Sequence, residues 1–120
     1  MASPKSRKVL VREFLTALDE LDQADAQLRQ KLRSTHSAVQ RSRRHFERGG
    51  TTWALITKMN ITSDRTANTE ALRGLDAARL RAQHAMYRLA EADGLNAAEI
   101  GRTWGVSRQL VSRVLNEKRT

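Results

Sequence analysis

One uninterrupted stretch of helix-compatible sequence constrains this fold more than any other feature. From about Lys8 to Arg48 the chain contains neither proline nor glycine. A helix over 8–48 would be roughly 60 Å long at about 1.5 Å per residue, too long for so small a chain to bury. Its residues fit a heptad in which most a and d positions are apolar: Val11, Phe14, Leu18, Leu21, Asp25, Leu28, Leu32, Thr35, Val39, Ser42 and Phe46. We therefore predict that this helix packs on a second copy of the chain or folds back on a later helix.

Asp25 limits how two copies of this helix can pair. In a parallel dimer the two Asp25 carboxylates would face each other in a dry interface, and such like charges are costly. An antiparallel or splayed homodimer through residues 8–48 avoids that contact and is our first hypothesis. An intramolecular helical bundle is the alternative.

The middle of the chain is also predicted to be helical. Pro4 is the only proline, and no stretch alternates apolar and polar residues for the length of a strand. Gly49-Gly50 should end the long helix, and Thr51 or Thr52 can cap a short one. We expect Trp53, whose neighbours are aliphatic, to be a core anchor of that short helix.

A further helix is expected from Ser63 or Asp64 to about Ala92, since apolar residues recur there at helical spacing. Gly94 should end it. We expect Met86 and Leu89 to cover the helices that follow.

Residues 96–117 have the pattern of two short helices joined by a tight turn. Asn96 can cap the first helix and Ser107 the second, and Gly105 supplies the positive φ that ends the first. Small and apolar residues should form the inner face: Ile100, Gly101, Trp104, Gly105 at the helix end, Val106 at the corner, Val111 and Val114. The outer face of the second helix then carries donors that suit base edges and phosphates in a major groove: Arg108, Gln109, Ser112, Arg113 and Asn116.

The string GVSRQLVSRVLN, Gly105 to Asn116, resembles the DNA-reading motif of LacI-type repressors, and the segment is also similar to sigma-factor region 4. The resemblance implies a helix-turn-helix in which Arg108, Gln109 and Arg113 touch bases. It implies phosphate contacts for Ser107, Ser112 and Asn116, and we expect the basic tail, Lys118 and Arg119, to add to them. LacI-type proteins carry this motif at the N-terminus, before a hinge and a sugar-binding domain that this sequence lacks. The resemblance therefore identifies a module.

The charge of the chain suits a polyanionic partner. Twenty-two Lys and Arg against 13 Asp and Glu give a formal net charge of +9. Part of this excess is local, because residues 31–48 hold six basic side chains and one acidic one. Arg41, Arg44 and Arg48 are predicted to share the face opposite the heptad seam. They form either a second patch that contacts phosphate or a solvated helix face.

The sequence gives little support for catalysis or for a cofactor. There is no cysteine, and the three histidines are far apart with no ligand-like spacing. We expect no enzyme activity, no cofactor, no metal and, with no ligand pocket evident, no small-molecule inducer. The apolar runs are too short for a membrane span or a signal peptide, so we expect a cytoplasmic, nucleoid-associated protein.

These observations predict an all-α protein with a basic disordered tail at 1–7, a dimerisation helix at 8–48, a short helix and linker at 49–63, and a trihelical DNA-binding domain at 64–120. We expect a sequence-specific transcriptional regulator that binds double-stranded DNA as a dimer. One alternative is a nucleoid-associated protein that bridges DNA with low sequence specificity. The other is a coiled-coil adaptor that binds RNA polymerase or another part of the transcription machinery.

Overall fold

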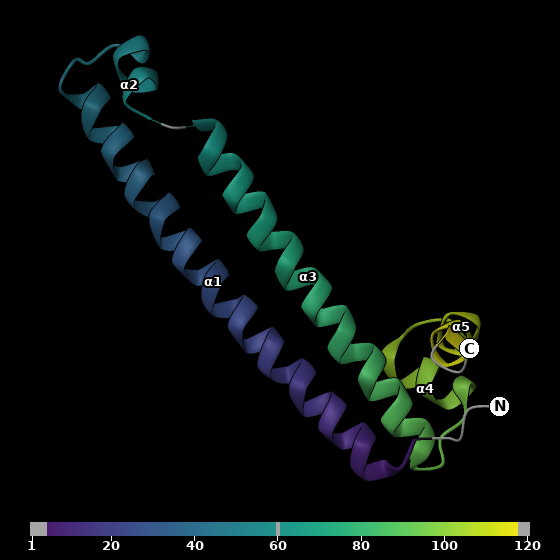
Figure 1. Ribbon diagram of the computed structural model, residues 1–120. Helices are drawn as coiled ribbons and strands as arrows, with labels where there is room; N and C mark the ends of the chain where they lie inside the picture. The colour runs from purple at the N-terminus through teal and green to yellow at the C-terminus, as the bar shows by residue number, and fades with distance from the viewer. Residues whose placement is uncertain (1–4, 60, 118–120) are drawn as a thin grey trace. The chain divides into compact units, whose positions relative to one another are not determined.

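Every regular element in the described part of the chain is a helix. The computed structural model describes residues 5–59 and 61–117. The helices are α1 (Arg7–Glu47), α2 (Thr52–Lys58), α3 (Ile61–Ala92), α4 (Ala97–Trp104) and α5 (Arg108–Glu117) (Figure 1). The predicted all-α class and the long N-terminal helix are therefore confirmed. Residues 1–4 of the expected tail lie outside the described residues.

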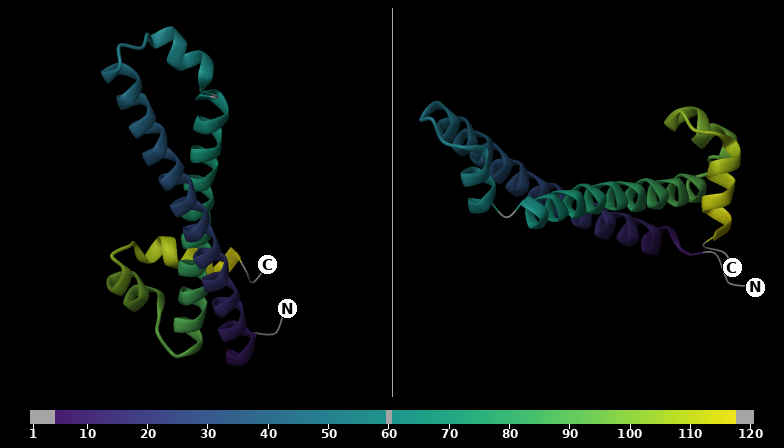
Figure 2. Two further views of the ribbon diagram at one scale, coloured as in Figure 1. Left: turned by 90° about the vertical axis from the view of Figure 1, so that its left-hand side faces the viewer. Right: turned by 90° about the horizontal axis from the view of Figure 1, so that it is seen from above.

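The chain divides into two compact units, and α1 and α3 each contribute one end to either unit. The terminal unit joins residues up to Leu21 with those from Ala77 onward, and the central unit covers Asp22–Asp76. In the terminal unit, the two short helices α4 and α5 lie against the C-terminal end of α3 (Figure 2).

In the terminal unit, the first part of α1 packs against the last part of α3. Ala17 meets Ala82 and Ala85 in a small apolar cluster, and Phe14 and Leu21 pack beside it. At the surface of the same unit, Nε of Arg7 donates to Oδ1 of Asp93 at 2.7 Å and Nε of Arg81 donates to Oε2 of Glu20 at 3.0 Å. Exposed ion pairs of this kind contribute little, so the alanine cluster carries most of this packing. In this unit the long helix thus folds back on a later helix.

The inward face of α1 is shifted from the predicted seam by part of a turn. The predicted d residues Phe14, Leu21 and Leu28 are half-buried, but the a residues Leu18, Leu32, Val39 and Phe46 are exposed. The inward positions lie one residue earlier, where Leu10 and Ala17 are buried and Ala24 and Ala38 are half-buried. Alanine lets a neighbouring helix approach more closely than leucine does. The larger a residues are therefore left as an exposed apolar stripe.

Gly49 ends α1 with a φ of 80°, and the amide of Gly50 bonds back to the carbonyl of His45 at 2.8 Å. Thr51 caps α2 through a bond from the amide of Ala54 to its hydroxyl at 3.2 Å. Both of these predictions are confirmed.

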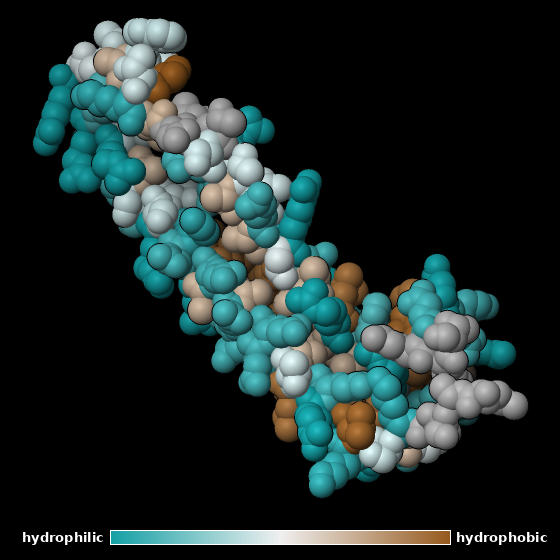
Figure 3. All heavy atoms as spheres, viewed as in Figure 1, coloured by the Kyte–Doolittle hydropathy of each residue, from teal (hydrophilic) through white to brown (hydrophobic). Residues whose placement is uncertain are grey.

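The prediction that Trp53 is a core anchor is wrong, because 74% of its surface is exposed. The helix α2 has only seven residues and turns one face inward, with Leu55 and Met59 half-buried. Trp53 and Ile56 fall on its other side. On the face of the molecule shown in Figure 3, the surface is mostly hydrophilic and the hydrophobic residues appear as separate patches.

None of the helices in the described part of the chain combines the length and the hydrophobicity that crossing a membrane requires.

Candidate nucleic-acid interface

Both ends of α4 are fixed by local hydrogen bonds. The side chain of Asn96 accepts a bond from the amide of Glu99 at 2.9 Å, and the carboxylate of Glu99 accepts one from the amide of Asn96 at 3.1 Å. This reciprocal capping box satisfies two amides that have no partner within the helix. At the other end Gly105 adopts a φ of 71°, and the amide of Val106 bonds to the carbonyl of Gly101 at 2.9 Å. The predicted caps at Asn96 and Gly105 are confirmed.

The turn from α4 to α5 is tight, and Gly101 makes it possible. A Cβ atom at residue 101 would lie 2.8 Å from the carbonyl oxygen of Val106 and 3.4 Å from the backbone nitrogen of Arg108. Only glycine lets the turn approach α4 this closely. The hydroxyl of Ser107 then accepts a bond from the amide of Leu110 at 3.1 Å and caps α5, as predicted.

A small core holds α4 and α5 on the end of α3. Ile100 and Val111 are fully buried, and Val114 and Leu115 are nearly so. Gly101 is also buried, and Val106 is half-buried at the corner. Five of the residues predicted for the inner face therefore do face inward: Ile100, Gly101, Val106, Val111 and Val114. Gly105, which was also predicted there, is exposed, and Leu115, which was not predicted there, is buried.

Trp104 and the contribution of α3 differ from the prediction. Trp104 is exposed and places its ring edge-to-face on Tyr87, with centroids 5.5 Å apart. Tyr87 is fully buried and takes the central place that we expected Met86 and Leu89 to share. One residue along a helix turns the inward direction by about 100°, so α3 presents Tyr87 and Ala90 instead. A sequence signal did exist, since Gln83 stands one turn before Tyr87 and donates to its hydroxyl.

The residues of α5 divide cleanly into two sides. At about 100° per residue, all of its apolar residues fall on one side of the helix. Five of its six polar residues, 108, 109, 112, 113 and 116, fall within an arc of about 140° on the other side, and Glu117 lies just beyond that arc. Arg108, Gln109, Arg113 and Asn116 are exposed, and Ser112 is half-buried. Lys118 and Arg119 lie outside the described residues.

The predicted base-reading arginines are free to donate. Within the described residues, neither Arg108 nor Arg113 pairs with a carboxylate within 4 Å. Each guanidinium can therefore present its planar fork of donors to solvent or to a ligand.

The last part of α3 holds two further basic side chains, Arg88 and His84. Burial lowers the pKa of Arg88, an effect opposed by Glu13, and the Nε of Arg88 has no hydrogen-bond partner. Burial also lowers the pKa of His84, Arg88 lowers it further, and Glu117 opposes the shift. No pattern in the sequence marks this pair, because its environment depends on the contact between α3 and its neighbours.

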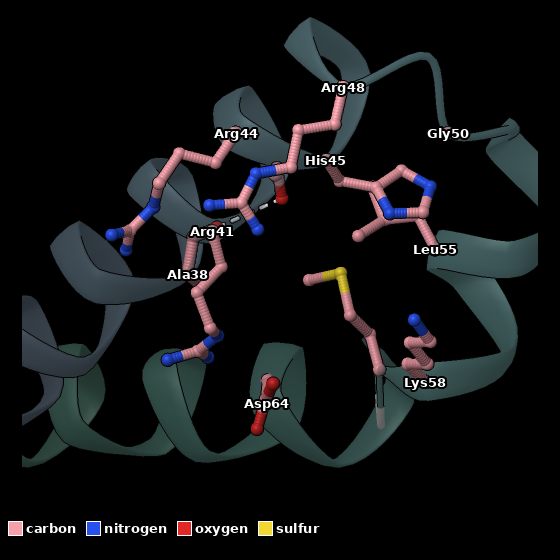
Figure 4. Close-up of a pocket in the computed structure, with 11 residues that line it drawn as sticks. Ala38, Arg41, Arg44, His45, Arg48, Gly50, Leu55, Lys58 and Asp64 are labelled. Atoms are coloured by element: carbon pink, nitrogen blue, oxygen red, sulfur yellow. Dashed lines mark hydrogen bonds between the residues drawn. The ribbon is translucent and has the colours of Figure 1, made fainter.

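The predicted second patch lies elsewhere than expected. Arg41, Arg44 and Arg48 do not stand on the face of α1 opposite its packing surface, but line a cavity in the central unit (Figure 4). The cause is the shifted seam, which turns this part of α1 toward α2 and the start of α3. In the described part of the chain, no three His, Asp or Glu side chains lie close enough to hold a metal ion.

No protein-family model matches the chain, and neither the curated proteins nor the solved structures contain a match to it.

Proposed function

We propose that the chain binds double-stranded DNA in a sequence-specific manner, with α4, the turn and α5 acting as a helix-turn-helix. The observation that carries this proposal is the division of α5. Its apolar side is fixed in a core with Ile100 and Tyr87, which leaves a rigid row of polar side chains facing outward. An α-helix of this kind fits the major groove of B-DNA, where base edges present distinct patterns of donors and acceptors.

The outward side chains suit two different tasks. Arg108 and Arg113 can each form two bonds with a guanine, and Gln109 can do so with an adenine. Ser107, Ser112 and Asn116 suit phosphate oxygens, which fix the register of the helix without reading sequence. The hydroxyl of Ser107 accepts the bond that caps α5, so its own hydrogen remains available to a phosphate. The net charge of +9 supports association with DNA as a whole.

We further propose that two copies act together, through the exposed apolar stripe on α1. Within this stripe Leu32 is 57% exposed and Val39 49% exposed, and Phe46 continues it. A row of apolar side chains that recurs every seven residues along a helix is typical of a surface that packs on another helix. A dimer would present two recognition helices to successive major grooves, roughly 34 Å apart.

Selection from random duplex DNA at physiological salt tests the function directly. Several rounds with the purified protein, followed by sequencing, should enrich a pseudo-palindrome. Retention of DNA without enrichment would instead favour a DNA-bridging protein of low specificity. If no DNA is retained, the proposal is wrong, and the stripe on α1 becomes the surface to test for a protein partner.

Arg113→Ala tests the role of α5 once a site has been selected. This variant should lose about 1–3 kcal/mol of binding free energy and show relaxed specificity at one base pair. Arg73→Ala, which removes an exposed arginine from α3 in the central unit, is the matched control and should bind like the parent. Equal affinity of Arg113→Ala and the parent would show that Arg113 reads no base.

A further inference from the structure

The central unit contains a cavity of about 600 Å³ between the end of α1, α2 and the start of α3 (Figure 4). This volume lies within the range of roughly 300–1,000 Å³ that is typical of sites for small organic ligands. No such pocket was evident from the sequence, and the expectation of no small-molecule inducer stays a prediction. The cavity could not be seen in the sequence, because its lining residues lie on three helices that come together only when the chain folds.

The charge around this cavity is strongly positive. Four cationic side chains, Arg41, Arg44, Arg48 and Lys58, line it together with one carboxylate, Asp64. The arginines follow one another at intervals of three and four residues, which places them on one face of α1. In Figure 4 they extend along one side of the cavity, and Lys58 stands on the other.

This positive charge is not neutralised within the chain. None of the four cations pairs with a carboxylate within 4 Å among the described residues. Cations gathered around a hollow repel one another and raise the local concentration of anions. Guanidinium groups also match the geometry of phosphate oxygens and bind them through paired hydrogen bonds.

The rest of the lining combines apolar side chains with Ser42 and the fixed ring of His45. Ala38, Leu55 and Met59 line the cavity and are half-buried. The ring of His45 is held by a bond from its Nε2 to the carbonyl of Thr51 at 2.7 Å, so Nε2 carries a hydrogen. Gly50 leaves room for this ring, because a Cβ atom there would lie 2.3 Å from Nε2. The cavity thus offers an apolar wall as well as a group of cations.

We propose that this cavity binds a small phosphorylated organic molecule of the nucleotide class. Its phosphates lie against Arg41, Arg48 and Lys58, and its apolar, ring-bearing part lies against Leu55 and Met59. A phosphate of the DNA backbone would use the cations but leave the apolar wall without a role, and the convex surface of a duplex does not enter a hollow of this size. The proposal does not depend on DNA binding by α5.

Calorimetric titration of the full chain with three probes tests the proposal. The probes are adenosine triphosphate, inorganic triphosphate and adenosine. The nucleotide should bind most tightly, because it alone supplies both the phosphates and the ring. Triphosphate should bind less tightly, and adenosine more weakly still.

Matched variants locate the binding. Arg41→Gln with Arg48→Gln should weaken nucleotide binding at least about tenfold, since charge-assisted hydrogen bonds are lost. Ala38→Leu, which fills the cavity without changing charge, should weaken it similarly. Arg33→Gln with Arg43→Gln removes two exposed arginines of α1 that do not line the cavity, and should have little effect. Circular dichroism and the thermal midpoint establish that each variant is folded.

Four results would overturn the proposal. The first is no binding of the nucleotide at millimolar concentration, and the second is equal affinity for nucleotide and triphosphate. The third is equal weakening by the cavity pair and by the control pair, which would reveal general charge attraction. In the fourth, the cavity variants bind duplex DNA more weakly than the parent does but bind the nucleotide equally well. That result would mean that these cations contact the DNA backbone. Each is distinguishable from a failure of α5 to bind DNA, because the nucleotide is titrated with no DNA present.

Discussion

Gly101 and Gly74 are two helical glycines whose surroundings predict opposite effects for the same substitution. A Cβ atom at residue 101 would press on the backbone of the turn at 2.8 Å, whereas nothing lies within 4 Å of a Cβ atom at residue 74. Gly101→Ala should therefore lower the free energy of unfolding by about 1–3 kcal/mol, because the backbone of the turn must move. Gly74→Ala should raise it by about 0.5–1 kcal/mol, since alanine favours the helix.

Urea denaturation followed by circular dichroism measures both changes. If Gly101→Ala is as stable as the parent, then the close approach of α4 and the turn is not required, and the geometry of the recognition helix loses its main support.

The lowered pKa of His84 predicts that the free energy of unfolding depends on pH. Burial and Arg88 lower its pKa in the folded chain, against the opposing effect of Glu117. The unfolded chain therefore takes up this proton at a higher pH, near the ordinary value of about 6.5. Below that pH the unfolded state binds more protons than the folded state, so the free energy of unfolding falls as the pH drops. The contribution of His84 is fully present only above that range.

His84→Gln should flatten the change in thermal midpoint between about pH 7.5 and pH 5.5. The matched control is His36→Gln, which replaces an exposed histidine of α1. Asp93, whose pKa is lowered by its hydrogen bond with Arg7, titrates at more acidic pH and does not interfere. An identical curve for His84→Gln and the parent would contradict the prediction.

The helix caps were predicted correctly, because each cap interacts only with residues close to it in the sequence. Asn96 caps the amide of Glu99, Ser107 caps the amide of Leu110, and Gly105 provides its own positive φ. A cap needs only the residues of one helical turn, and these are visible in the sequence.

For the long helices α1 and α3, the prediction of extent was successful, and the prediction of which face turns inward was wrong. The long helix was expected at 8–48 and runs from Arg7 to Glu47. The face that α1 or α3 turns inward depends on the size of the side chains across the contact, which a single helix does not show. On α3, Tyr87 takes the buried central place that was expected for Met86 and Leu89. On α2, Trp53 is exposed where a core anchor was expected.

The exposed apolar stripe on α1 can be tested as the contact between two copies of the chain. If two copies pair through it, Leu32→Glu with Val39→Glu should convert a dimer to a monomer, because charges would enter an apolar contact. Gln30→Glu with Ser37→Glu adds the same charge on the opposite side of α1, where both residues are exposed, and should leave the dimer intact. Light scattering at micromolar concentration measures the mass of each. A monomeric parent chain would rule out the dimer.

For the molecule as a whole, the proposed dimer and α5 as the proposed recognition helix would together determine how the chain reads DNA. On this proposal, a single α5 would make only a few base contacts, and its affinity for DNA would rest largely on charge, which gives strong salt dependence but little specificity. Coupling two copies makes the second contact intramolecular, so affinity then depends on the distance between half-sites.

This coupling is tested by inserting about five base pairs, half a helical turn, between the half-sites of the selected palindrome. The parent should bind the lengthened site at least about tenfold more weakly, because only one α5 can then face its half-site. The variant with Leu32→Glu and Val39→Glu should bind both duplexes weakly and equally. Equal affinity of the parent for the two duplexes would mean that its recognition helices act independently. If the variant keeps the preference for the original spacing, then another surface than the α1 stripe joins the two copies, while sequence recognition by α5 stands.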